Sequence, residues 1–566
     1  MSYKTIAIEN LLGLNEDKNP HALQPGELSR ARNVARRSTN LVGTRPGAVV
    51  LGAGEDYENA LVGSPAIQGA VEYRKNFDEN RALVVVANNP GAGVDPNSKI
   101  WVEDDKRLDD ATTPTITAGA NNVWTFALHQ NLLYAAGGAS GDDVWTWDGD
   151  QATPSAPIVL ALTDKATGVR LRPKFVKEWR GYVLLNGLRG AVTDSNNPAV
   201  SRFQTFGSDP TANGNWLDGN TLGFSNTQVG VDTFGGAYTT GFGTYQDNKG
   251  DYLLVLSNNQ IISFVRDPTG FSDFLRNDVI AVGCVHQRAF IDLGPDAGDA
   301  IFQSREGVHS VRQSQQHGNQ ESAFLSRKIE TTFNSLNPNR RELSCAAYDR
   351  KHGRIVFAWS TGASSQHDIL MALDVRYPES LNSKDALWYG PWVLSAQTRV
   401  NELLYARNAA GEFQLYAFTT NGRVLEFNED VYHDLATGAY EVDLITKHEA
   451  YNAISLEKRL GDTMVHCAPG GSHSVQVTSI WNYGEKVTGP VQLRQPDTNA
   501  PVLPVILPFV LGQSSISSDV KLYTTGRGRT LAQRFYHNAA NQPFFLGRIE
   551  RQVAGAGEDT GAPTAG

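Results

Sequence analysis

Pairs of adjacent carboxylates are the residues of this chain that could support acid–base chemistry. They occur at Asp104–Asp105, Asp109–Asp110 and Asp142–Asp143. A glycosidase needs two carboxylates about 5 to 10 Å apart across a cleft. Because neighbouring side chains in an extended segment point to opposite faces, adjacent carboxylates do not meet this requirement. The pattern favours solvated turn residues, and we predict no catalytic residues.

The sequence offers few ligands for a metal ion or a cofactor. The twelve histidines are scattered, and none has the His-Glu-x-x-His spacing of a zinc site. The stretches 194–197 and 245–251 are rich in Asp and Asn but lack the ligand ladder and closing Glu of a calcium loop. The basic turn at 526–529 is no phosphate-binding glycine loop. We therefore predict neither a metal site nor a cofactor.

An arginine cluster lies near the N-terminus of an otherwise acidic chain. Its members are Arg30, Arg32, Arg36, Arg37 and Arg45. These guanidinium groups could clamp phosphates, but no aromatic stacking platform accompanies them, as single-strand binding requires. The remaining interpretations are bonds to acidic faces of neighbouring copies of the chain, or simple solvation. We favour a role in assembly between copies.

The segment SDPTANGNW at 208–216 is the strongest enzymatic motif. It resembles the Ser-x-Asp-x-Gly-x-x-Trp turn of sialidase-type propellers, but it is two residues longer and occurs once. In those proteins the turn is structural, with the Asp capping a hairpin and the Trp packing between blades. We therefore assign Asp209 and Trp216 to a structural turn.

Composition excludes several classes of protein. The chain has 566 residues and a formal net charge of −10, which argues against sequence-independent nucleic-acid binding because that needs concentrated Lys and Arg. Its three cysteines are far apart and unpaired in sequence, which indicates free thiols in a protein made in a reducing cytosol. The N-terminus has no signal-peptide pattern, and no apolar run is long enough to predict a membrane-spanning segment.

A short hairpin unit recurs seven times and predicts the fold. Each unit alternates apolar and polar residues, is interrupted by Asn- and Gly-containing turns and closes on an aromatic strand. The copies lie at 69–103, 123–150, 175–188, 251–268, 300–313, 344–375 and 413–430. Because one small sheet cannot bury both of its faces, such units must pack radially or in a stack. We predict an all-β chain with an irregular β-propeller of about six or seven blades.

The spacing of the units divides the chain into four parts. Residues 1–65 are polar and turn-rich and are expected to form an N-terminal arm and assembly segment. Residues 66–435 form the propeller, with long insertions, one of which predicts a short amphipathic helix within 323–336. Residues 436–554 carry strands of a different texture and predict a β-sandwich or barrel-like domain. Residues 555–566 are low-complexity and predict a flexible tail.

The opening segment 10–47 resembles the start of the tail nozzle (tail tubular or tail stabilisation) proteins of short-tailed bacteriophages. The matching residues form a Gly-Leu-Asn segment, a Pro-Gly-Glu turn, an Asn-Val pair and an Arg-Pro-Gly end: Gly13, Leu14, Asn15, Pro25, Gly26, Glu27, Asn33, Val34, Arg45, Pro46 and Gly47. The order of segments 177–187, 201–216, 253–267 and 301–311 is similar to the propeller portion of that family. The closing segment 533–553 is similar to its last strand pair.

The resemblance implies a structural protein of the virion, made in the host cytoplasm and carried in the phage tail. As a homohexamer it would form a ring below the portal and the adaptor (head-to-tail connector) protein. Genomic DNA would leave through its lumen without specific binding during genome ejection, and tail fibre, spike or needle proteins would attach to it. Six copies would form a closed cyclic assembly, and their net negative charge would keep DNA from adhering.

Two other functions remain open. A propeller glycoside hydrolase would need paired carboxylates that converge on blade loops at the axis. A glycan- or receptor-binding tail protein would need exposed aromatic residues on its insertions, for which Trp101, Trp216 and Trp388 are the candidates. A ring assembly favours the nozzle, whereas a monomer favours the enzyme.

Overall fold

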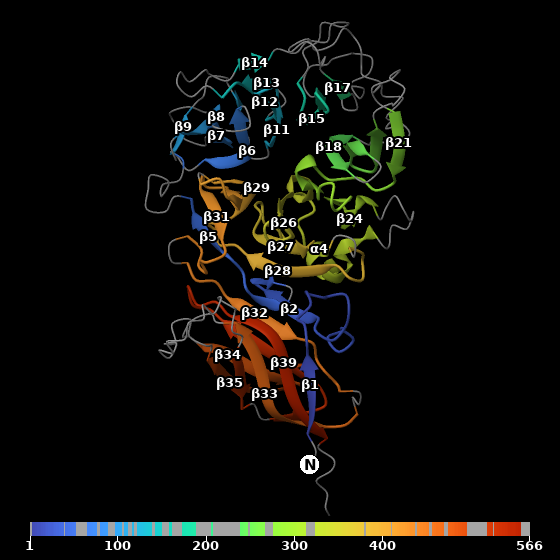
Figure 1. Ribbon diagram of the computed structural model, residues 1–566, viewed down its shortest axis with the longest axis vertical. Coiled ribbons are helices and arrows are strands. Elements are labelled where there is room, and N and C mark those ends of the chain that lie inside the picture. Colours follow the sequence, from blue (N-terminus) through green and yellow to red (C-terminus); the bar gives the residue numbers. More distant parts are fainter. Residues whose placement is uncertain are drawn as a thin grey trace, which may run out of the picture.

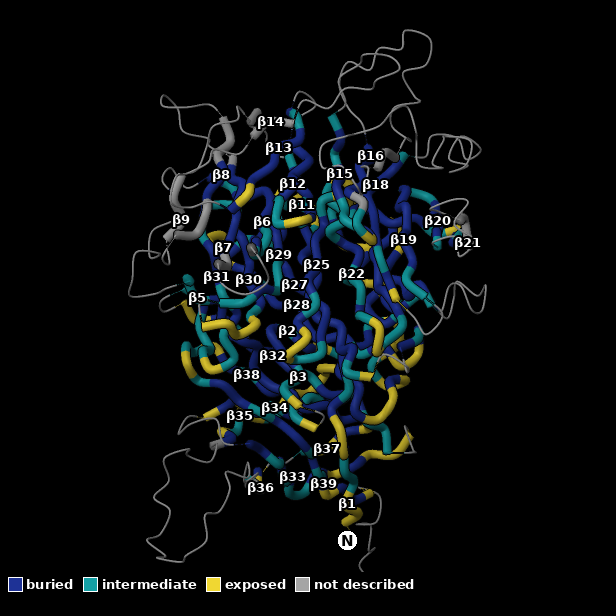
Figure 2. Tube along the Cα trace, turned by 45° about the horizontal axis from the view of Figure 1, so that its top comes forward, coloured by how far each residue is buried: buried dark blue, intermediate teal, exposed yellow. Residues whose placement is uncertain are grey.

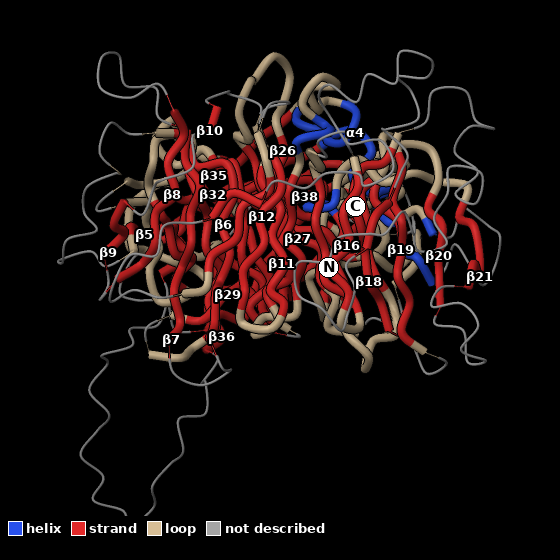
Figure 3. Tube along the Cα trace, turned by 90° about the horizontal axis from the view of Figure 1, so that it is seen from above, coloured by secondary structure: helices blue, strands red, loops and turns tan. Residues whose placement is uncertain are grey.

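The computed structural model describes most of the chain from residue 3 to residue 555. The gaps are 39, 52–60, 62–64, 76–79, 89–96, 105–106, 111–115, 118–121, 139–141, 150–157, 161–171, 188–204, 208–237, 247–249, 266–274, 313–322, 378–380, 409, 436–437, 452–454, 469–473, 495–517 and 524–525. Strands dominate the described residues, and Figure 3 shows the few helical turns gathered mainly beside α4 (Glu330–Asn334).

Seven small antiparallel sheets follow one another along the chain and form the upper part of the molecule in Figure 1. The first contains β6 (Ala66–Lys75), β7 (Asn80–Asn88), β8 (Asn97–Asp104), β9 (Arg107–Asp110) and β10 (Ile116–Thr117). The second contains β11 (Trp124–His129), β12 (Leu132–Gly137), β13 (Val144–Trp147) and β14 (Ile158–Leu160). The third contains β15 (Phe175–Trp179), β16 (Tyr182–Asn186) and β17 (Thr205–Gly207).

The remaining four sheets continue the series. The fourth contains β18 (Thr239–Gln246), β19 (Asp251–Ser257), β20 (Ile261–Val265) and β21 (Leu275–Ile280). The fifth contains β22 (Phe290–Asp292), β23 (Ala300–Gln303) and β24 (Val308–Ser310). The sixth contains β25 (Cys345–Asp349), β26 (Arg354–Trp359), β27 (Ile369–Asp374) and β28 (Leu387–Val393). The seventh contains β29 (Val400–Arg407), β30 (Phe413–Thr419), β31 (Val424–Asn428) and β5 (Gly47–Val50).

The seven sheets close into a propeller. The first strand of each sheet contacts the first strand of the next, in the order β6, β11, β15, β18, β22, β25 and β29, and β29 contacts β6 again. The last blade is completed by β5, which pairs with β31 through Leu425↔Val50 and Asn428↔Gly47. The predicted irregular propeller is confirmed, and its described residues form seven blades.

A two-layer β-sandwich forms the lower part of the molecule (Figure 1). One sheet contains β1 (Lys4–Ile8), β3 (Val34–Ser38), β4 (Leu41–Thr44), β33 (Lys458–Ala468), β36 (Ser518–Leu522), β37 (Gly526–Gly528) and β39 (Phe545–Gly555). The other contains β2 (Leu28–Arg32), β32 (Val442–Thr446), β34 (Ser474–Trp481), β35 (Lys486–Arg494) and β38 (Leu531–His537). The predicted C-terminal sandwich is confirmed as a fold, but it includes strands from the N-terminus.

The expectation of a separate N-terminal arm is therefore wrong. Residues 1–65 supply four strands to the sandwich and one strand to the last blade. Their apolar side chains belong to one buried core that continues from blades five to seven into the sandwich, and Figure 2 shows this buried trace running from β27 and β28 through β2 and β32. The sequence alone suggested an arm because the residues that pair with this polar segment are far away in the sequence, so nothing nearby indicated that it is part of the core.

Two other sequence expectations concern local structure. The helix expected within 323–336 is a 3-10 turn, η5 (Leu325–Ile329), followed by the single turn of α4. Its apolar residues Leu325, Ile329, Phe333 and Leu336 are buried, as its amphipathic spacing requires. The three cysteines, all within the described residues, are buried, and none of them is in a disulfide. No helix among the described residues is long and apolar enough to cross a bilayer.

Candidate functional site

The five clustered arginines lie at the junction between the propeller and the sandwich. Each forms an ion pair inside the chain: Arg30 with Asp443, Arg32 with Glu441, Arg36 with Asp374, Arg37 with Glu429 and Arg45 with Asp434. We call these five the junction arginines. Their partners lie in or next to the sandwich, at the end of β27 in blade six, and in the segment that leaves blade seven. Each junction arginine thus has an acidic partner within its own chain, and the expected role in assembly between copies stays a prediction.

Arg45 is the centre of this junction. Its guanidinium is fully buried and makes a two-pronged contact with Asp434, at 3.0 and 2.7 Å. Its Nε donates to Asn33 Oδ1 at 3.1 Å, and its Cζ lies 3.8 Å from the centre of the Tyr440 ring. Burial raises the pKa of the Tyr440 hydroxyl, so this group stays protonated and donates to the Arg45 carbonyl oxygen at 2.7 Å. A buried guanidinium with this many partners fixes the chain at one position.

Asn33 explains how the chain turns between β2 and β3. Its backbone has φ 54°, a left-handed conformation that Asn tolerates better than most residues. Its Nδ2 donates to the Glu441 carbonyl oxygen at 2.6 Å, and its Oδ1 accepts from the Val393 N–H at 2.7 Å. One side chain therefore links the sandwich strands to the last strand of blade six.

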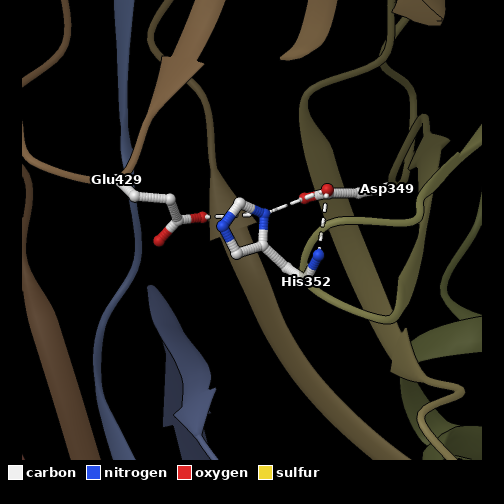
Figure 4. A group of neighbouring side chains, drawn as sticks. All are labelled: Asp349, His352 and Glu429. Atoms are coloured by element: carbon white, nitrogen blue, oxygen red, sulfur yellow. Dashed lines mark hydrogen bonds and ion pairs between the residues drawn. The ribbon is translucent and has the colours of Figure 1, made fainter. Parts of the chain in front are cut away.

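A second cluster, Asp349, His352 and Glu429, has the geometry of a possible cation site (Figure 4). One ligand atom from each residue lies within 4.8 Å of the others. His352 Nδ1 is 2.9 Å from Asp349 Oδ2, Arg354 also pairs with both carboxylates, and Arg37 pairs with Glu429. Although burial opposes it, hydrogen bonds from His352 and Arg354 lower the pKa of Asp349. The two guanidinium groups already balance the carboxylates and would repel a metal ion, so the cluster is an ion-pair network joining blades six and seven to β3.

The third candidate is a cavity on the propeller axis, of about 270 Å³, which we call the axial cavity. It is lined by residues of all seven inner strands or their approaches, among them Val71, Phe126, Lys177, Phe242, Phe290, Ala346 and Leu404. Two acidic residues, Asp292 and Glu402, are among its described lining residues. The axis of a propeller is where ligand sites form, because loops or strands of every blade converge there.

One end of the axial cavity is closed by residues of η4 (Gln287–Ala289). Gln287 Nε2 donates to the Val176 carbonyl oxygen at 3.0 Å, and its Oε1 accepts from the Phe242 N–H at 3.2 Å. Arg288 is directed toward the opposite blades, where it pairs with Glu402 at 2.6 Å and donates to the Leu343 carbonyl oxygen at 2.7 Å. These side chains bridge blades three and four, and blades six and seven, across the axis.

The residues expected to mark a site are placed differently. Asp209 and Trp216 lie outside the described residues. Trp101 and Trp388 are buried, and Trp388 Nε1 donates to the Leu325 carbonyl oxygen at 2.9 Å, so neither offers a surface for a glycan. Sequence reasoning did not single out Lys177, Arg288 or Asp292. The only feature of the sequence that could have indicated these three residues is their position in or next to the first strand of a blade, which faces the axis.

Comparisons with known proteins give distant structural similarity alone. No family model matches the chain, and no curated protein matches it. BBS1N in its complex with ARL6DN has 10% identity and a TM-score of 0.37, with 68% of this chain and 98% of that chain covered. An exo-β-1,3-galactanase from Phanerochaete chrysosporium has 12% identity and a TM-score of 0.26, with 90% and 100% covered. A glycoside hydrolase has 10% identity and a TM-score of 0.24, with 88% and 100% covered.

Proposed function

We propose that this chain is a structural virion protein, the tail nozzle of a short-tailed bacteriophage. The observation that supports it is the location of the residues that carry the resemblance to that family. Ten of these eleven residues are buried, Pro25 being exposed, and they lie where the N-terminal segment joins the propeller to the sandwich. The family pattern thus coincides with the residues on which this chain's two-part architecture depends.

Physical chemistry explains several positions of that pattern. A Cβ on Gly13 would lie 2.5 Å from the Trp388 carbonyl oxygen, so no side chain fits there. Gly26 has φ 89°, a conformation that glycine adopts without strain. Glu27 is buried, accepts from the Gln24 N–H at 2.7 Å and pairs with Lys328 at 3.1 Å. A chain with other residues at these positions would not make the same junction.

In this proposal the genome passes between copies of the chain. The axis of one propeller is bridged by Gln287 and Arg288, so it leaves no room for a DNA duplex. A ring of six copies would enclose a lumen, and the net charge of −10 on each copy would disfavour adhesion of phosphate groups. The adaptor protein would bind one end of the ring, and fibre, spike or needle proteins would bind the other or its rim.

We propose no enzymatic activity for this chain. Of the two carboxylates in the axial cavity, Glu402 is held by Arg288 at 2.6 Å. Asp292 is then the one acidic residue among the described lining residues without a cationic partner within ion-pair distance, whereas glycoside hydrolysis uses two carboxyl groups. Turnover of sialosides or bacterial polysaccharides that is lost in Asp292→Asn would overturn this part of the proposal.

Electron microscopy and mass measurement test the nozzle directly. Recombinant protein, alone and mixed with the adaptor–portal complex of its own phage, is expected to give rings with six-fold symmetry and six times the 61.6 kDa chain mass. Particles produced without this chain are expected to lose packaged DNA. A chain that stays monomeric in both samples and is absent from purified tails would contradict the proposal.

A further inference from the structure

The axial cavity is a pocket with one closed end and one wide end. Gln287 and Arg288 form the closed end. Beyond Arg288 a hollow of only about 10 Å³ remains. On the other side, a hollow of about 480 Å³ shares Phe290, Asp292 and Leu404 with the axial cavity and extends toward Arg350 and Phe413. A small molecule could therefore enter from that side and stop at Arg288.

Two side chains of opposite charge face the axial cavity without pairing with each other. Lys177 on β15 makes no hydrogen bond or ion pair with a described residue, and no ion pair joins it to Asp292 at the end of β22. One Asp292 oxygen accepts from the Gly294 N–H at 2.8 Å. Burial lowers the pKa of Lys177 and raises that of Asp292, although each charge favours the other. The Lys177 ammonium group and the Asp292 carboxylate therefore line the same cavity, and neither has an ion-pair partner among the described residues.

Apolar side chains line the same cavity as these two charges. Phe126, Phe242, Phe290 and Leu404 line the cavity together with Lys177. At the closed end Gln287 bonds to the surrounding blades and Arg288 pairs with Glu402, and the Nε of Arg288 has no hydrogen-bond partner among the described residues. A ligand that binds here must satisfy one cation and one anion and must also cover apolar side chains.

We propose that the axial cavity binds a small zwitterion, namely an α-amino acid with an apolar side chain. Its carboxylate pairs with Lys177, its ammonium group pairs with Asp292, and its side chain packs on Phe242 and Phe290. A purely anionic ligand would leave Asp292 unpaired, and a purely cationic ligand would leave Lys177 unpaired. A cavity of about 270 Å³ is near the lower limit of small-molecule sites, ~300 Å³, so it suits a single amino acid better than an oligosaccharide. This site is independent of the proposed assembly.

The test uses the full-length protein and three probes. L-phenylalanine carries both charges, N-acetyl-L-phenylalanine carries the anion alone, and L-phenylalanine amide carries the cation alone. Trp124 lines the cavity and is buried, so its fluorescence can report binding beside isothermal titration calorimetry. We expect L-phenylalanine to bind at least roughly tenfold more tightly than either analogue. Equal binding of an analogue, or no binding of L-phenylalanine at about 10 mM, would overturn the proposal.

Variants assign the binding to this cavity. Lys177→Met and Asp292→Asn are expected to weaken L-phenylalanine binding by roughly tenfold or more each. Lys384→Met is the matched control, because Lys384 is exposed in the turn before β28 and should leave binding unchanged. Lys177 and Asp292 are half-buried and have no ion-pair partner among the described residues, so removing either charge should not lower the melting temperature, and circular dichroism separates loss of binding from loss of fold. Binding that survives both cavity substitutions would overturn the assignment.

Discussion

The propeller and the sandwich are both built from antiparallel strands, but the propeller pairs mainly strands that are close in sequence, whereas the sandwich also pairs strands from the two ends of the chain. In blade six, β25, β26 and β27 pair in sequence order, and Asp349 pairs with Arg354 across a short turn. In the sandwich, β1 pairs with β39, so Lys4 lies opposite Val553, and Leu28 lies opposite Thr446. Blades one to six form from local hairpins, whereas each sandwich sheet is completed only when strands from the two ends of the chain pair.

Burial also differs between the two regions. All six residues of β26 are buried, because each blade is covered on both faces by its neighbours. Along β34 buried and more exposed residues alternate, because only one face of that sheet meets the other layer. This difference in burial indicates that each blade is stabilised by the neighbouring blades of the ring. The sandwich depends instead on the N-terminal strands and on the junction arginines.

Deleting residues 1–50 is expected to have the largest effect. It removes β1 to β5, and with them strands from both sandwich sheets and the last strand of blade seven. We expect an insoluble chain or one without a cooperative thermal transition, measured by circular dichroism. Adding residues 1–50 as a separate chain during refolding should restore part of that transition. A truncated chain that melts like the full-length protein would show that the sandwich does not need these strands.

Arg45→Ala is expected to have the next largest effect. It leaves Asp434 buried without its partner, and breaking a buried ion pair costs about 3 to 5 kcal/mol of stability. Arg30→Ala is the matched control, because Arg30 is half exposed and its pair should contribute no more than about 1 kcal/mol. Urea denaturation compares the two. Equal costs would mean that Arg45 does not anchor the junction.

Acid pH is expected to destabilise the propeller through its buried histidines. Burial lowers the pKa of His367 to about 3 and that of His309 to about 4. The unfolded chain therefore binds more protons below pH ~6.5, so stability is full above that pH and falls as the pH decreases. At pH 5 His367 alone should cost about 2 kcal/mol. Thermal unfolding of His367→Gln at pH 7 and pH 5 should show a smaller loss than the original chain, and an equal loss would refute this role.

The smallest expected effects are those of exposed ion pairs, one from each region. Arg305 pairs with Glu342 in the propeller at 2.6 Å, and Arg527 pairs with Glu457 in the sandwich at 3.7 Å, and all four side chains are about half exposed or more. Arg305→Ala and Arg527→Ala should each change stability by less than about 1 kcal/mol. A larger change in one alone would mean that its region depends on surface charge, which the comparison does not predict.

The sequence predicted the parts of the fold that are local. Two hairpin turns are examples: Gln130–Asn131 joins β11 to β12, and Arg180–Gly181 joins β15 to β16. All four residues have positive φ, and the alternating residues of the flanking strands predicted both hairpins. The last strand of blade seven was not predictable, because β5 pairs with residues nearly 400 positions away. This pairing was not predicted because the two strands are far apart in the sequence, and not because β5 has a weak strand pattern.

The site was harder to predict than the fold. From the sequence, Arg45 was expected to be solvated or to bind another copy, because nothing in the sequence indicates that Asp434 is buried beside Arg45. The axial cavity depends on seven inner strands meeting at one axis, so Lys177 and Asp292 line the same cavity only after the ring closes. Their spacing in sequence carries no chemical motif.

Closure of blade seven by β5 also sets the order of events during synthesis. The ribosome makes β5 early, but its partner β31 ends at Asn428. At roughly 5 to 20 residues per second, β5 waits about 20 to 75 s before its partner emerges. Its edge is unpaired during that time and could join another nascent chain. A chaperone that covers the first 50 residues during synthesis is therefore expected to raise the yield of folded protein.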